Sequence, residues 1–157
     1  MHSVEIITAV EDRYCATQGN PSLGEAFEMW ALRWSSGLRD RETALRLMFL
    51  AWYSCSEPND LTGLPCDERL KQTFADAFES LGGANSTDAE VCYVVGLMAR
   101  LFPWCIGEEG NWSRTGLALT QRAQLLALEG IQPRVFQNRG VYGEYFAHML
   151  ACGARDA

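Results

Sequence analysis

Apolar residues recur at helical spacing along almost the whole chain, and this periodicity constrains the fold more than any other feature. In the clearest segment, the apolar positions follow the i, i+3, i+4, i+7, i+8, i+11 pattern of an amphipathic helix: Leu23, Ala26, Phe27, Trp30, Ala31 and Trp34. Alternation with a period of two, which is typical of β-strands, is almost absent. The sequence therefore predicts an all-α fold of about six to seven amphipathic helices.

Residues that start and stop helices divide this pattern into segments. Asp40 is a predicted N-cap, because its carboxylate can accept a hydrogen bond from a free backbone N–H of the first turn. Thr87 and Glu90 have the spacing of a capping box. The predicted helices cover residues 4–17, 23–37, 40–58, 67–81, 87–103, 114–129 and 142–151, with irregular loops at 58–66 and 106–113.

Two stretches of the chain resemble each other at a spacing of about 50 residues. Residues 25–28 (EAFE) reappear as 76–79 (DAFE), and Met48 and Cys55 correspond to Met98 and Cys105. A repeat of this kind predicts two stacked helix hairpins, one from the second and third predicted helices and one from the fourth and fifth. Chance similarity within an ordinary orthogonal helix bundle is the alternative. In either arrangement, residues 1–157 are predicted to form one domain.

The charge balance narrows the class of partner. The net charge is −7, and Lys and Arg form no cluster, which argues against binding to nucleic acid or to an anionic membrane surface. No apolar run is long enough to span a bilayer, and the first ten residues do not have the pattern of a signal peptide. The sequence thus predicts a cytoplasmic protein whose partner is a basic or apolar protein segment.

The cysteines are predicted to be free. The chain has six of them and contains no Cys-x-x-Cys pair, so neither a zinc knuckle nor a thioredoxin-type redox centre is expected. Cys55, Cys92 and Cys105 fall on predicted apolar helix faces, where cysteine behaves as a small hydrophobe. A reducing compartment and a sufficient core both argue against disulfides.

The most unusual segment is the predicted loop at 106–113. Glu108 and Glu109 lie there between Trp104 and Trp112, close to two glycines. Paired carboxylates can share a proton or bind a hard cation, and tryptophans in a loop either pack back on the core or contact a ligand. A solvated turn anchored by its tryptophans is the simpler interpretation.

Two further pairs were considered as chemical sites. Glu144 and His148 are four residues apart on the last predicted helix and can supply two metal ligands, although a metal needs three or four. An intrahelical contact between them is the simpler interpretation. Cys105 and His148 would need to meet in space to form a nucleophile and its base. Nucleotide-binding and α/β-hydrolase motifs are absent from the sequence, and no cofactor or metal is expected.

These observations favour a protein-interaction module that binds a peptide or helix of a partner protein. The candidate binding residues are the aromatic side chains left over once the inner helix faces are filled, together with the acidic loop: Tyr53, Tyr93, Trp104, Glu108, Glu109, Trp112 and Tyr142. In size and charge the chain resembles small acidic helical chaperones and immunity proteins of bacterial secretion systems, a likeness that no motif carries. The alternatives are a metal-assisted helical enzyme using Glu108, Glu109, Glu144 and His148, which is the less favoured class, and a structural homodimer.

Overall fold

The computed structural model describes residues 1–17 and 20–156. Within those residues the chain forms eight α-helices and no strand, so the predicted all-α fold is confirmed. The helices are α1 (Val4–Ala16), α2 (Leu23–Ser35), α3 (Arg41–Ser56), α4 (Asn59–Thr62), α5 (Arg69–Ser80), α6 (Ala89–Leu101), α7 (Glu109–Leu126) and α8 (Gly140–Asp156). Three short 3-10 helices lie between them: η1 (Gly83–Asn85), η2 (Pro103–Cys105) and η3 (Pro133–Phe136).

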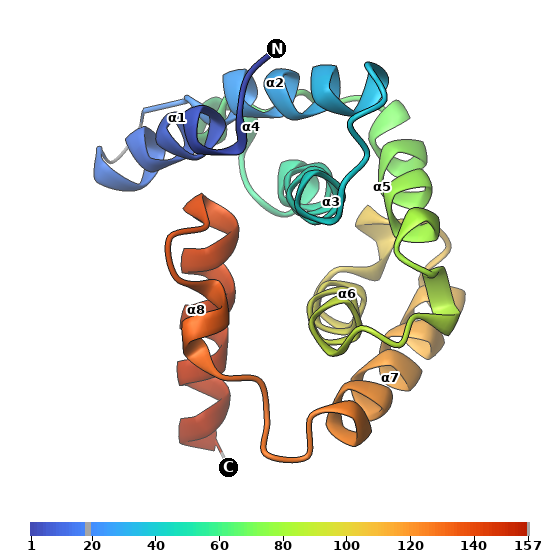
Figure 1. The fold of residues 1–157 in the computed structure, drawn as a ribbon. Coiled ribbons are helices and arrows are strands. Elements are labelled where there is room, and N and C mark those ends of the chain that lie inside the picture. Colours follow the sequence, from blue (N-terminus) through green and yellow to red (C-terminus); the bar gives the residue numbers. More distant parts are fainter. Residues whose placement is uncertain (18–19, 157) are drawn as a thin grey trace.

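Two helices form the centre of the molecule. Figure 1 shows α3 and α6 nearly end-on, with the other long helices arranged around them. Every residue of α3 from Thr43 to Trp52 is buried, because α3 is covered on all sides. The sequence predicted only one apolar stripe on this helix. A helix that is surrounded buries its polar side chains as well, and these then need partners.

The packing order differs in part from the two predicted hairpins. α2 packs on α3 as expected, but α5 packs mainly on α3, and α6 packs mainly along α7. Glycines allow the close α6–α7 contact, since a Cβ on Gly96 would lie 3.0 Å from the Thr120 nitrogen and a Cβ on Gly116 would lie 2.9 Å from Ala99 Cβ. The fourth and fifth predicted helices correspond to α5 and α6. They follow each other in the sequence, but each packs mainly on a different helix, so they do not form the predicted second hairpin.

The helix caps agree with the sequence at one position and differ at another. Asp40 caps α3, and its carboxylate accepts a hydrogen bond from the Thr43 N–H at 3.0 Å. The predicted capping box of Thr87 and Glu90 is wrong. Asp88 is the N-cap of α6 and accepts from two backbone N–H groups. An aspartate caps as well as a threonine, and the Glu90 side chain is buried in contacts with other helices.

A chain of buried ion pairs joins α8 to the rest of the fold. Arg46 of α3 donates to Glu11 of α1 at 2.5 Å and to Glu42 at 2.9 Å. Arg139, directly before α8, donates to the same Glu42 at 2.5 Å and also to Glu90 of α6. These alternating charges connect four segments that lie far apart in the sequence, and they hold the start of α8 in place. The Arg139 side chain is only 15% exposed, because these ion pairs hold it against α3 and α6.

Neighbouring side chains add hydrogen bonds to the carboxylates of these ion pairs. Trp30 Nε1 donates to Glu11 at 3.0 Å, and the Tyr142 hydroxyl donates to Glu90 at 2.6 Å. Burial raises the pKa of Glu11, although the Arg46 guanidinium opposes this shift. Gly140 is needed at the start of α8, since a Cβ there would lie 2.5 Å from Arg46 Nη2 and its φ is +61°.

A disulfide joins the C-terminal end of α3 to the 3-10 helix that follows α6. Cys55, at the end of α3, is bonded to Cys105 of η2, which follows α6. The expectation of six free cysteines is therefore wrong, and so is the placement of Cys55 on a buried face, because its side chain is exposed. The two bonded cysteines are also the two that correspond to each other in the apparent repeat. Within the described part of the chain, every helix is too short or too polar to span a bilayer.

Candidate functional site

A groove lined by tyrosines lies where α1, α3, α4 and α8 meet. Its volume is about 730 Å³, and most of its wall is apolar. We call it the tyrosine groove and define it by the residues that line it: Tyr14, Cys15, Tyr53, Leu61, Val141, Glu144, Tyr145 and His148. The wall combines aromatic rings, aliphatic groups and polar atoms, which is the usual composition of a ligand-binding surface.

Aromatic packing holds the rings of this groove. Tyr53 stacks on Phe49 with ring centroids 5.0 Å apart, and it meets Tyr145 edge-on at 6.0 Å. Phe49 is fully buried, so the two half-exposed tyrosines rest on a rigid base. The third wall comes from Tyr14 in the last turn of α1, and the ion pair between Glu11 on the same helix and Arg46 holds α1 against α3. The groove is therefore preformed.

The tyrosine side chains of the groove are uncharged, whereas acidic residues lie at its edge. Burial raises the pKa of Tyr53, as does its hydrogen bond with the Tyr14 hydroxyl, and burial also raises the pKa of Tyr145. Both phenols are therefore protonated at neutral pH. Glu144 lines the groove, and the negative charge of Glu57 acts on both tyrosines.

The one cysteine in the wall of the groove is unsuited to nucleophilic chemistry. Burial, together with the neighbouring Glu144 carboxylate, raises the pKa of Cys15 to about 12. The thiol is therefore protonated at neutral pH, and the thiolate is the reactive form of cysteine. The arrangement can bind an apolar segment and attract a positive charge at its edge.

The structure brings together residues that the sequence placed in separate hypotheses. Tyr53 was a candidate binding residue, whereas Glu144 and His148 were considered as metal ligands, and all three line the tyrosine groove. His148 Nε2 lies 3.4 Å from Sγ of Cys152, one turn further along α8. The structure does not bring Cys105 and His148 together, because Cys105 lines a different pocket and is bonded to Cys55 there.

The acidic loop is not a loop. Residues 109–113 belong to α7, which begins five residues before its predicted start at 114. Glu108 is the N-cap, and its carboxylate accepts hydrogen bonds from the backbone N–H groups of Gly110 and Asn111. These bonds lower the pKa of Glu108. Glu109 occupies the first turn, where a negative charge is favourable.

The other four candidate aromatics lie in four different places. Trp112 packs on the rings of Phe74 and Phe78, with centroids 5.7 and 5.6 Å away. Tyr142 is fully buried, so it is not a surface aromatic as predicted. Trp104 is half exposed beside the disulfide, and Tyr93 lines a separate groove against the end of α8. The predicted set therefore does not form one patch.

The metal hypothesis is not supported by the positions of its residues. Glu108 and Glu109 begin α7, whereas Glu144 and His148 lie on α8 in the tyrosine groove. Among the residues that the structure describes, no three His, Cys, Asp or Glu side chains are grouped closely enough to hold a metal ion.

Five residues that line the groove were not candidates from the sequence: Tyr14, Cys15, Leu61, Val141 and Tyr145. Helical periodicity places Tyr14 and Tyr145 on the apolar faces of their helices. Tyr14 lies in the last turn of α1, and a face that is covered in the middle of a helix is often open at its end. Tyr145 is the sixth residue of α8, and no local pattern marks it as part of a groove. Leu61 is 51% exposed on the four-residue helix α4, which has too few residues for periodicity to be read.

Comparison with known proteins gives no match to a protein family, to a curated protein or to a solved structure.

Proposed function

We propose that this protein is a protein-interaction module whose tyrosine groove binds a short segment of a partner protein. The segment has an apolar or aromatic anchor side chain followed by Lys or Arg. The observation that carries the proposal is the convergence of three tyrosines from three helices on one groove with an acidic edge. Tyrosine is enriched at protein interfaces, because it combines a large apolar ring with a polar group.

The dimensions of the groove suit an anchor of this kind. A volume of about 730 Å³ accommodates one large aromatic side chain and the backbone on either side of it. Preformed rings also lower the entropic cost of binding, because few side chains need to be ordered. The hydroxyl groups and the His148 ring can accept or donate hydrogen bonds to the backbone of an extended segment.

The charge of the molecule supports a basic partner. The net charge is −7, Glu144 lines the groove, and the negative charges of Asp12 and Glu57 act on Cys15 and Tyr53 in its wall. Complementary charge mainly increases the rate of association and the specificity, and salt screens it. Binding is therefore expected to weaken as the salt concentration rises.

Selection from a random peptide library tests this proposal. Enrichment of peptides that combine an aromatic or aliphatic anchor with Lys or Arg is the expected result. Affinities are then measured by fluorescence anisotropy for the wild type and for Leu61→Lys, which places a positive charge at the groove and repels a basic segment. The matched control is Leu32→Lys, because Leu32 of α2 is 53% exposed against 51% for Leu61 and lies away from the groove.

The groove variant should weaken binding at least about tenfold, equivalent to about 1.4 kcal/mol, whereas the control should leave binding unchanged. If no peptide is enriched, or if the two variants weaken binding equally, the proposal is wrong.

A homodimer is the second candidate, and a separate feature favours it. Leu125, Leu126 and Leu128, at the end of α7, are 73%, 44% and 84% exposed. Exposed apolar residues that are adjacent in this way are typical of subunit contacts. Light scattering across a range of protein concentrations tests this candidate, and a monomer at every concentration would exclude it.

A further inference from the structure

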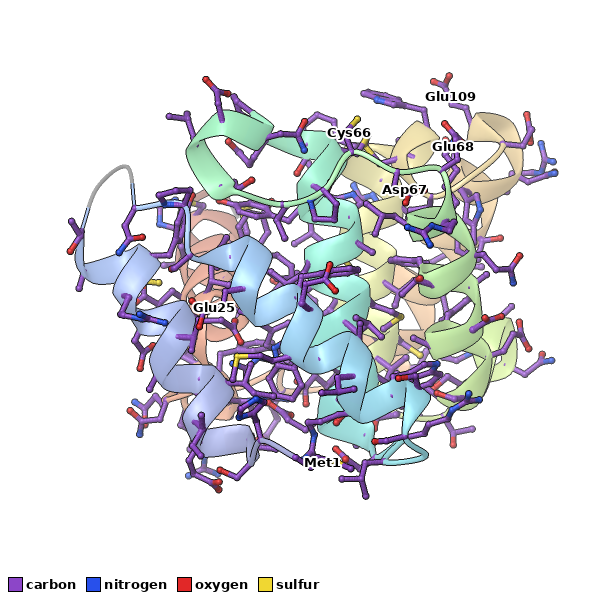
Figure 2. All side chains as sticks on the ribbon, turned by 90° about the horizontal axis from the view of Figure 1, so that it is seen from above. Met1, Glu25, Cys66, Asp67, Glu68 and Glu109 are labelled. Atoms are coloured by element: carbon purple, nitrogen blue, oxygen red, sulfur yellow. A yellow bond between two sulfur atoms is a disulfide. The ribbon has the colours of Figure 1, made fainter. Side chains whose placement is uncertain are left out.

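Three cysteines line one pocket at the end of the central helices. The disulfide partners Cys55 and Cys105 and the free cysteine Cys66 all line a pocket of about 320 Å³, together with the half-exposed Trp104. Figure 2 shows Cys66 at this edge of the molecule, with Asp67 and Glu68 beside it and Met1 at the opposite edge. A free thiol and a disulfide thus share one solvent-accessible site.

Hydrogen bonds hold Cys66 close to the disulfide. The Ser54 hydroxyl, one residue before Cys55, donates to the carbonyl of Pro65, one residue before Cys66. Asn59 Nδ2 donates to the carbonyl of Leu64 at 3.0 Å. The segment that carries Cys66 is therefore fixed against the end of α3. Cys55 and Cys66 each directly follow one member of the hydrogen-bonded pair Ser54 and Pro65.

The three cysteine residues differ in exposure, and this difference favours attack on Cys55 rather than on Cys105. Cys66 and Cys55 are exposed, whereas Cys105 is only 6% exposed. An attacking thiolate meets the accessible sulfur of a disulfide more readily than a buried one. Cys55 is therefore the sulfur that is attacked, and Cys105 is the one that is released.

We propose that Cys55, Cys66 and Cys105 form a thiol–disulfide exchange site. The thiolate of Cys66 attacks Sγ of Cys55, the Cys55–Cys105 bond breaks, the Cys55–Cys66 bond forms, and Cys105 leaves as a thiolate that takes up a proton. The number of disulfides and thiols is unchanged, so the step needs no oxidant or reductant.

A small thiol from outside the protein enters the same site. Its thiolate attacks Cys55 and releases Cys105, which leaves a mixed disulfide on Cys55. Cys66 then attacks Cys55, forms the Cys55–Cys66 bond and expels the small thiol unchanged. The small thiol therefore acts as a catalyst of the exchange. The exchange frees α3 from η2 and ties it instead to the segment before α5.

Disulfide mapping of the wild-type protein tests the proposal. The oxidised protein is incubated at mildly alkaline pH with a catalytic amount of reduced glutathione, quenched with acid, digested without reduction and analysed by mass spectrometry. The expected result is a Cys55–Cys66 peptide together with a free thiol on Cys105. Cys92 is buried and serves as the internal control that stays free. Finding only the Cys55–Cys105 bond would overturn the proposal.

Two variants isolate the role of Cys66. Cys105→Ser should form the Cys55–Cys66 bond when oxidised glutathione is added, because both remaining cysteines are exposed and line the same pocket. Cys66→Ser should retain the Cys55–Cys105 bond without exchange. A folded Cys105→Ser protein in which Cys55 and Cys66 acquire only separate glutathione adducts would contradict the proposed proximity.

Discussion

Arg46 is expected to be the charged residue on which the stability of this fold depends most. Its side chain is 1% exposed, and that of its partner Glu11 is 0% exposed. Replacing Arg46 with Met removes the only guanidinium that contacts Glu11 among the described residues. Breaking a buried pair in this way costs about 3–5 kcal/mol, because a buried carboxylate is left without a countercharge.

The cost can be separated from the loss of side-chain volume. In the double variant Glu11→Gln/Arg46→Met no ionised group remains at this position, and the Gln oxygen can still accept from Trp30 Nε1. Most of the stability should therefore return. Arg13→Met is the exposed control, since Arg13 and its partner Glu25 are 54% and 60% exposed, and screening by solvent limits its cost to about 1 kcal/mol or less.

The pH dependence gives a second measurement of the same effect. Burial raises the pKa of Glu11, and removal of Arg46 should raise it further. A carboxyl group with a raised pKa binds its proton more tightly in the folded state, so its contribution to stability falls as pH rises from the unfolded to the folded pKa. The slope is at most about 1.4 kcal/mol per pH unit for one proton. In Arg46→Met this fall should extend to higher pH than in the wild type.

Urea unfolding of the four proteins at several pH values measures both effects. If Arg46→Met is no less stable than Arg13→Met, or if the double variant recovers none of the loss, the reasoning about the buried charges is refuted.

Reduction of the disulfide, or Cys55→Ser, should lower the free energy of unfolding by up to about 4 kcal/mol, because the bond closes a loop with a sequence separation of 50; urea unfolding with and without dithiothreitol measures this. Gly96→Ala should lower the melting temperature, because its Cβ would lie 2.8 Å from Thr120 Oγ1, whereas Gly153→Ala meets nothing within 4 Å and should raise it. Equal shifts in the two variants would contradict the packing account. Glu108 has a lowered pKa, so its cap is fully formed above the ordinary glutamate range and is lost as pH falls through the folded pKa. The protection of the amides at the start of α7 against hydrogen exchange, relative to the intrinsic exchange rate at each pH, should therefore fall at low pH, and it should already be low at neutral pH in Glu108→Ala.

The sequence located the bounds of five helices well, whether or not one face is exposed. α1, α2, α3, α5 and α6 begin and end within about two residues of their predicted ends, because the apolar periodicity and the residues that start and stop helices agree there. The start of α7 was missed, because Gly107 and Gly110 indicated a loop and Glu is a less common N-cap than Asp or Ser.

The candidate site was largely hidden in the sequence for a physical reason. The tyrosine groove is formed by residues between Tyr14 and His148, and no local pattern records that α1, α3 and α8 meet. The same holds for Glu11, Arg46 and Glu90, since periodicity treats charged residues as solvent-facing and only their tertiary partners show that they are buried. A general argument from compartment and size predicts free cysteines, and this prediction is wrong. The repeat places Cys55 and Cys105 at corresponding positions, which was the available sign that they pair.

The disulfide also determines how the molecule responds to mechanical force. Tension that unfolds the protein is carried across the bond from Cys55 to Cys105, so the intervening segment, which contains α4, α5 and α6, does not lengthen. With a separation of 50 residues, about 170 Å of chain is withheld from extension. After the exchange with Cys66, only the short segment between Cys55 and Cys66 would be withheld, so the site would set the length to which the unfolded chain can be stretched.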